Sequence, residues 1–293
     1  MIHSGILEYR KSQYFWWALI LVVLSVVIYL TQSEDDPPNG GTWQGYTIGT
    51  IGAILVFWLS LLGIRKRKYR SRLGTVAGWT SAHVYLGAAV TIIATLHSAS
   101  QLGWNIHTLS YVLMLTVVFS GFVGLYYYLT LPQKSLRNRS GQSREIMFAE
   151  LIELDEQGKS IASRCSSDIA LAATSAIDRT AIGGGVRAQL LRSDKSKMKI
   201  FANDTQNLVE NRDQARVLRI VANQIPDAAR QSEVEPLREL LSVLSRRQAV
   251  IRRIVRDIQL QGMLRIWLYF HIPLTVALLI ALIMHIIATF LYW

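Results

Sequence analysis

Five long apolar segments, each free of Lys, Arg, Asp and Glu, alternate with polar stretches along the chain. They cover about residues 14–31, 46–64, 76–99, 108–131 and 266–293. A helix of about 18 or more apolar residues is long enough to cross a hydrocarbon core about 30 Å thick. The pattern therefore predicts five transmembrane helices. The composition, 51% hydrophobic over 293 residues, also favours a membrane protein over a soluble domain.

A polar and basic stretch separates the fourth apolar segment from the fifth. We therefore predict an N-terminal membrane region over 1–131, an insert over 132–265 and a fifth transmembrane helix over 266–293. Apolar periodicity within the insert predicts a helix over about 204–224 and a long helix from Pro236 toward the fifth segment. Residues 146–154 fit either a strand or a short helix. The expected fold class is all-α, a polytopic membrane protein with a mainly helical insert.

Basic residues are concentrated on one side of the predicted membrane. The loop after the second segment holds six Lys and Arg between Arg65 and Arg72, whereas the loops at 32–45 and 100–107 hold none. With alternating spans, all 31 Lys and Arg fall on one side, which the positive-inside rule assigns to the cytoplasm. We therefore expect a multi-pass protein of the bacterial inner (plasma) membrane. Its N-terminus and insert would be cytoplasmic and its C-terminus periplasmic.

Four of the six histidines lie within the apolar segments, in two pairs of equal spacing. His83 and His97 are 14 residues apart in the third segment, and His271 and His285 are 14 apart in the fifth. This spacing is close to four helical turns, so each pair shares one helix face, with its members about 21 Å apart along the axis. Both helices run from the cytoplasm outward. His83 therefore matches His271 in depth near the cytoplasmic face, and His97 matches His285 near the outer face.

Neutral imidazole is a common axial ligand of haem iron, so two His–His pairs predict two b-type haems stacked across the bilayer. A single intramembrane histidine is as often a packing or proton-relay residue. Two identical spacings at matching depths favour metal binding by all four. Without Cys, Asp or Glu nearby, zinc and non-haem iron fit poorly.

Other residues are candidates for contacts with the haems. Gly87 lies one turn after His83 and leaves room for a flat ring, while Arg72 and Arg265 are candidate partners for the propionates of the inner haem. His107 opens the fourth segment without a partner at the 14-residue spacing. It fits either an interfacial polar residue or a hydrogen-bond donor to an outer propionate.

The paired His-x13-His helices resemble those of dihaem cytochromes b, which include respiratory cytochrome b and the ferric reductase and NADPH oxidase membrane domain. The stretch His83-Val-Tyr-Leu-Gly87, ending in Leu96-His97, looks most like the ferric reductase type. The resemblance covers about 76–131 and 266–293. The chain shows neither the FAD- and NADPH-binding domains usual in ferric reductases nor the Pro-Glu-Trp-Tyr motif of respiratory cytochromes b. No flavin, nicotinamide or defined quinone site is therefore carried over.

These features favour an electron-transfer subunit of an oxidoreductase complex over a complete enzyme. We expect electrons to cross the membrane between a cytoplasmic flavoprotein or iron–sulfur protein and a periplasmic carrier such as a cytochrome c. The alternative is a quinone-reactive cytochrome b anchor of a membrane oxidoreductase. A transporter or scaffold with structural histidines is a third, less favoured interpretation.

The insert contributes a basic stretch of its own. It contains Arg246, Arg247, Arg252, Arg253 and Arg256 on the predicted long helix. This stretch fits a surface lying against anionic lipid or a dock for an acidic redox partner. Nucleic-acid binding is not expected, because aromatic residues are sparse and no nucleic-acid-binding motif is present.

Overall fold

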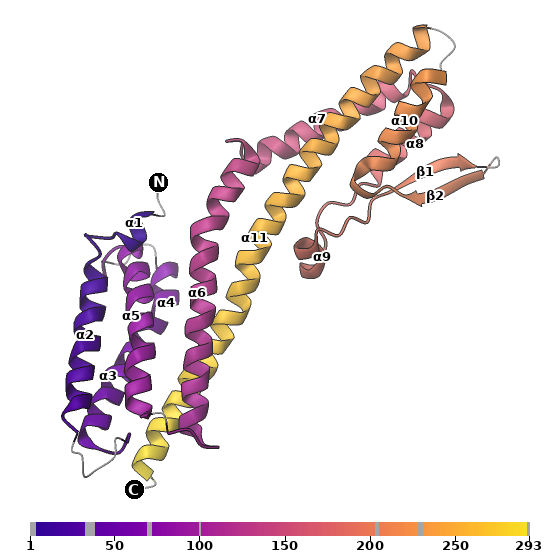
Figure 1. Ribbon diagram of the computed structural model, residues 1–293. Helices are drawn as coiled ribbons and strands as arrows, with labels where there is room; N and C mark the ends of the chain where they lie inside the picture. Colours follow the sequence, from indigo (N-terminus) through magenta and orange to yellow (C-terminus); the bar gives the residue numbers. More distant parts are fainter. Residues whose placement is uncertain are drawn as a thin grey trace. The chain divides into compact units, whose positions relative to one another are not determined.

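The computed structural model describes residues 4–32, 39–68, 72–99, 101–202, 205–227 and 231–291. The chain is mostly helical and divides into two compact units (Figure 1). The first unit comprises 1–129 and 267–293, and the second comprises 130–266. Helices α6, Ile106–Arg139, and α11, Gln231–Leu291, each contribute residues to both units.

The first unit contains the apolar helices. They are α1 Ser4–Leu7, α2 Gln13–Leu30, α3 Trp43–Ser60, α4 Leu62–Arg67 and α5 Val76–Ser98, with the first part of α6 and the last part of α11. Among the described residues, five helical segments are long and apolar enough to cross a membrane. Many large apolar side chains on them are exposed, including Trp16, Phe119 and Phe290. Such surfaces suit contact with lipid, and the chain is a multi-pass membrane protein.

Helix α5 lies at the centre of the first unit and packs along both α2 and α3. Its buried face includes small side chains such as Ala82 and Ala89, which let neighbouring helices approach closely. Local polar caps fix where the helices begin: the hydroxyl of Thr42 accepts from the Gly45 amide at 3.1 Å, and that of Thr75 accepts from the Gly78 amide at 3.1 Å. The Thr75 cap sets the beginning of α5, the helix that carries His83 and His97.

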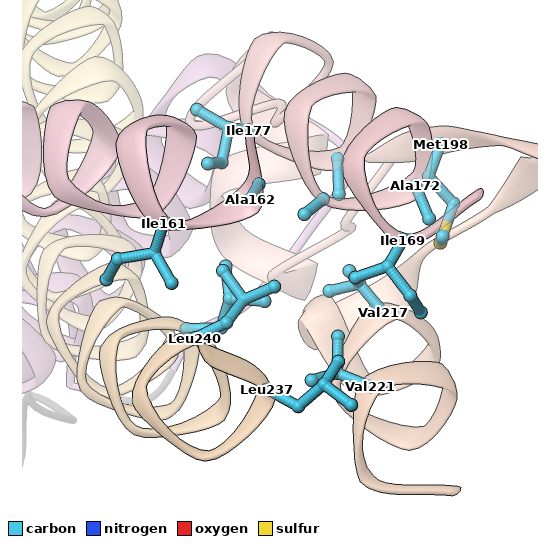
Figure 2. Packing of buried hydrophobic residues seen from close by; sticks show 13 residues of the cluster. Ile161, Ala162, Ile169, Ala172, Ile177, Met198, Val217, Val221, Leu237 and Leu240 are labelled. Carbon is cyan, nitrogen blue, oxygen red and sulfur yellow. The ribbon is translucent and has the colours of Figure 1, made fainter. Parts of the chain in front are cut away.

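The second unit is helical with one β-hairpin. Its elements are α7 Arg144–Ala162, α8 Ser167–Asp178, α9 Val186–Leu191, β1 Lys197–Ala202, β2 Thr205–Glu210, the 3₁₀ turn Arg212–Gln214, α10 Ala215–Asp227, and parts of α6 and α11. Figure 2 shows its apolar core, in which Ile161, Ile169 and Val217 come from α7, α8 and α10. Met198 of β1 and Leu240 of α11 complete it, each fully buried.

Parts of the insert differ from the prediction. The helix expected over 204–224 is wrong in its first half, because Thr205–Glu210 form strand β2 and α10 begins only at Ala215. The strand pairs antiparallel with β1, which in turn lies on α8, where the Lys199 amide donates to Ser175 Oγ at 2.8 Å. These distant partners outweigh the local helical pattern. Residues 146–154 are helical, within α7, and the long helix starts at Gln231, five residues before Pro236.

The basic stretch of α11 is largely paired within the second unit. Arg247 is buried and reaches Asp155 at 2.5 Å, Arg246 pairs with Glu150 at 3.0 Å, and Arg252 pairs with Asp213. These three guanidinium groups are therefore neutralised by the insert itself. The free basic surface is smaller than the sequence indicated.

A second ion cluster surrounds Asp257, whose side chain is almost fully buried. Its carboxylate accepts hydrogen bonds from Arg139 at 2.7 Å, Arg144 at 2.6 Å and Ser135 at 2.6 Å. Burial alone would raise the pKa of Asp257, but these hydrogen bonds hold it at about 2. The cluster therefore ties residues of α6, α7 and α11 together through one carboxylate.

Candidate functional site: two histidine pairs in the membrane unit

The structure brings the four histidines of the apolar segments together as two pairs. His83 of α5 faces His271 of α11, with ring centres 6.5 Å apart and ring planes at 67°. His97 faces His285 with ring centres 5.9 Å apart and planes at 79°. Two imidazoles bound to opposite sides of one metal ion, each through a nitrogen about 2 Å away, have ring centres roughly 6 Å apart. Both pairs thus have the separation that a shared metal ion requires.

Both histidines of α5 are anchored by carbonyl oxygens of α3. The Nδ1 of His83 lies 3.1 Å from the Leu59 carbonyl, and the Nδ1 of His97 lies 2.9 Å from the Gly45 carbonyl. A carbonyl can only accept, so each ring carries its proton on Nδ1. The Nε2 lone pair is then available as a ligand. Metal-binding histidines characteristically donate their other ring N–H in this way.

The histidines of α11 are anchored by side chains of α6. His271 Nδ1 lies 2.6 Å from Ser120 Oγ, whose own proton is donated to the Val117 carbonyl at 2.8 Å. The hydroxyl therefore accepts from His271, which again leaves Nε2 free of a proton. His285 Nδ1 lies 2.7 Å from Nδ1 of His107. Over the described parts of the chain, all four rings make their hydrogen bonds through Nδ1 alone.

Glycines lie where a larger residue would collide with the rings. A Cβ atom on Gly49 would fall 2.6 Å from Cε1 of His97, and one on Gly40 would fall 3.4 Å from the same atom. At the inner pair, a Cβ on Gly121 would be 3.8 Å from Cε1 of His271. A Cβ on Gly87 would meet nothing within 4 Å. Gly87 therefore borders open space inside the membrane unit.

That open space is a cavity beside the inner pair. It is about half open to the outside, and the enclosed part of it has a volume of about 90 Å³. His83 and His271 both line it, as do Gly87 and Gly121, and most of the other lining side chains are apolar. The apolar lining, with the two imidazoles exposed on it, is chemically suited to an apolar group bound through imidazole nitrogens.

The two arginines predicted to meet the haem propionates are not brought together in the way that the histidines are. Arg72 and Arg265 are both exposed, and Arg265 belongs to the second unit. Within the first unit, Lys66 interacts electrostatically with His83, and its Nζ lies 5.7 Å from the ring centre of Tyr128. Lys66 is therefore a further candidate cation near the inner pair. The sequence contained its signal, because α4 continues directly from α3 and carries the start of the basic loop.

His107 is the other residue that the spacing argument missed. No histidine lies 14 residues from His107, so the spacing gave it no partner. Only a short loop separates it from the end of α5, however, so His107 is expected at about the same membrane depth as His97. Its observed partner is His285, so neither interpretation offered for it from sequence describes this contact. Loop length was the signal that would have identified it.

Comparison with family models, curated proteins and solved structures found no match to this chain. In the part of the chain that the structure describes, no three or more His, Cys, Asp or Glu side chains converge as a metal site. Each candidate site consists of two histidines. A metal ion already bound by four nitrogens of a planar ring would need two further ligands from the protein.

Proposed function

We propose that this chain is a dihaem b-type cytochrome, the membrane electron-transfer subunit of an oxidoreductase complex. The observation that carries the proposal is the presence of two opposed histidine pairs, 6.5 and 5.9 Å between ring centres. In both, every Nδ1 has a hydrogen-bond partner, and the oxygen partners of His83, His97 and His271 leave the Nε2 atoms of those three rings free to bind a metal. A haem held by two histidines supplies one-electron transfer.

The residues of this chain would hold and orient the two groups. Nδ1 anchors on α3 and α6 keep the four rings from rotating, as hydrogen-bond partners of metal-binding histidines do. Gly87 and Gly121 leave the inner cavity open for a flat ring, and Gly49 admits His97 close to α3. The mostly apolar lining disfavours water at the inner position.

The two pairs occupy two levels of α5 and α11, about 21 Å apart along a helix axis. Together they would carry electrons between the two faces of the membrane. The positive-inside rule puts the His83 pair near the cytoplasm and the His97 pair near the periplasm. A cytoplasmic flavoprotein or iron–sulfur protein would then exchange electrons at one end, and a cytochrome c or similar carrier at the other.

Spectroscopy of the purified full chain tests this proposal. A reduced-minus-oxidised difference spectrum should show a b-type band, and haem extraction should give two haems per chain. His83→Gly and His97→Gly should each lower the count to one, and added imidazole should restore the missing haem by occupying the vacated ligand position. Thr116→Ala is the matched control, because Thr116 is exposed on α6 and bonds only to its own helix at Val112.

Absence of haem from the folded wild-type chain would overturn the proposal. So would histidine variants that keep both haems. Reconstituted vesicles extend the test: a membrane-impermeant reductant on one side should reduce an impermeant acceptor on the other only when both histidine pairs are intact.

A further inference from the structure

His107 and His285 form a direct imidazole–imidazole contact. Their Nδ1 atoms lie 2.7 Å apart, and the rings are nearly perpendicular, at 82°, with centres 4.5 Å apart. Only one proton can lie between two such nitrogens, so one ring donates and the other accepts. The direction of that donation decides what His285 can do.

If His107 donated, His285 would carry its own proton on Nε2, and that nitrogen could not bind a metal. If His285 donates, its Nε2 lone pair is free to face His97. A functional outer site therefore requires His107 as the acceptor, with its own proton on Nε2. The other three ring anchors are oxygen atoms that already favour this direction.

The position of His107 is fixed by the beginning of α6. The side-chain oxygen of Asn105 accepts from the Thr108 amide at 2.9 Å, and the Gly103 amide donates to Thr108 Oγ1 at 3.0 Å. These bonds hold the first turn of α6, which contains His107. The ring is thus presented to α11 from an ordered helix end.

We propose that His107 is the positioning residue of the outer site, orienting His285 and selecting the tautomer that binds through Nε2. The inference rests on the proposed function, since it concerns how the outer haem would be held. A hydrogen-bond partner of a metal-binding histidine typically contributes roughly 10–100-fold to metal affinity. The other site has no part in this contact and should be unaffected.

Two substitutions separate the hydrogen bond from simple space filling. His107→Leu keeps much of the bulk and removes the acceptor, whereas His107→Asn keeps an acceptor oxygen near the position of Nδ1. Leu109→Ala, exposed in the first turns of α6, is the control. The measurements are haem content, the electron paramagnetic resonance signals of the oxidised haems, and the two midpoint potentials.

We expect His107→Leu to weaken retention of one haem roughly 10–100-fold, or to shift its resonance and potential, while the other haem is unchanged. His107→Asn should restore the wild-type signals. Unchanged haems in His107→Leu, loss of both haems, or a defect that Asn does not repair would each overturn the inference. A wild-type chain without haem would overturn the proposed function instead.

Discussion

A Cβ atom on Gly49 of α3 would lie 2.6 Å from Cε1 and 2.8 Å from Nδ1 of His97. These separations are well inside van der Waals contact, so His97 occupies space that only glycine leaves open. The neighbouring Gly45 carbonyl fixes the same ring from α3. One helix thus supplies both the room and the anchor for a histidine of another.

Gly49→Ala should therefore displace His97 and remove one haem of the two. In an unconstrained helix the same change would add about 0.5–1 kcal/mol of stability. At Gly49 the contact with His97 should instead make the substitution destabilising. Haem content of the purified variant is the measurement. Gly63→Ala in α4, where a Cβ would meet nothing within 4 Å, should keep both haems. Two haems in Gly49→Ala would contradict the assignment of His97 as a ligand.

Gly87→Ala should impair haem binding without destabilising the haem-free chain. Because a Cβ at Gly87 would meet no protein atom, the haem-free variant should unfold at the same temperature as wild type or a higher one. The same methyl group would intrude on the cavity beside His83, so the inner haem should be lost or weakly bound. Thermal unfolding without haem and haem counting after reconstitution check the two halves. Full haem content would show that no flat group lies against Gly87.

Asp257→Asn should destabilise the second unit by about 3 kcal/mol, because it removes a buried charge that two partly exposed arginines share. Thermal unfolding of the full chain, followed by circular dichroism, measures the loss. Glu239→Gln is the control. Its pair with Arg164 has both side chains about half exposed, and losing it should cost no more than about 1 kcal/mol.

The same carboxylate predicts a pH dependence. The pKa of Asp257 is lowered to about 2 from an ordinary value of 3.8, so its contribution is complete above about pH 4 and disappears as the pH falls toward 2. The shift corresponds to roughly 2 kcal/mol. Wild-type stability should fall by that much more than the stability of Asp257→Asn over this interval. Equal acid sensitivity of the two proteins would count against the prediction.

Cys165 is a natural probe of membrane orientation, as it is the one cysteine of the sequence. In sealed vesicles a membrane-impermeant maleimide should label it only when the cytoplasmic face is outward. Burial raises the pKa of this half-buried thiol, so labelling should be slow and should accelerate with pH. Leu102→Cys, made together with Cys165→Ser, should show the opposite sidedness. Labelling of Cys165 from the periplasmic face would refute the topology.

The membrane helices were largely predictable because each span depends on its own composition. The segment expected at 76–99 is α5 at Val76–Ser98, and the segment at 14–31 is α2 at Gln13–Leu30. The pairing of His83 with His271 followed from helical period and direction. A 14-residue spacing fixes which face a side chain occupies, whichever helix lies opposite.

Contacts that depend on the packing of remote segments were not predictable in this way. The place of Gly49 against His97 requires the distance between α3 and α5, which no local pattern contains. The pairing of Arg247 with Asp155 and the strand at 205–210 likewise depend on partners far along the chain. His107 was predictable in part. The short loop before it fixes its approximate depth in the membrane, but the sequence does not show that it contacts His285.

The two halves of each histidine pair are far apart along the chain. His83 and His97 are synthesised early, whereas His271 and His285 are synthesised only after the whole of 130–266 has been translated. Until then the two histidines of α5 lack their partner histidines of α11. Haem capture would accordingly be a late event in biogenesis, following translation of the intervening unit. A ribosome stalled within that unit would hold a chain unable to retain either haem.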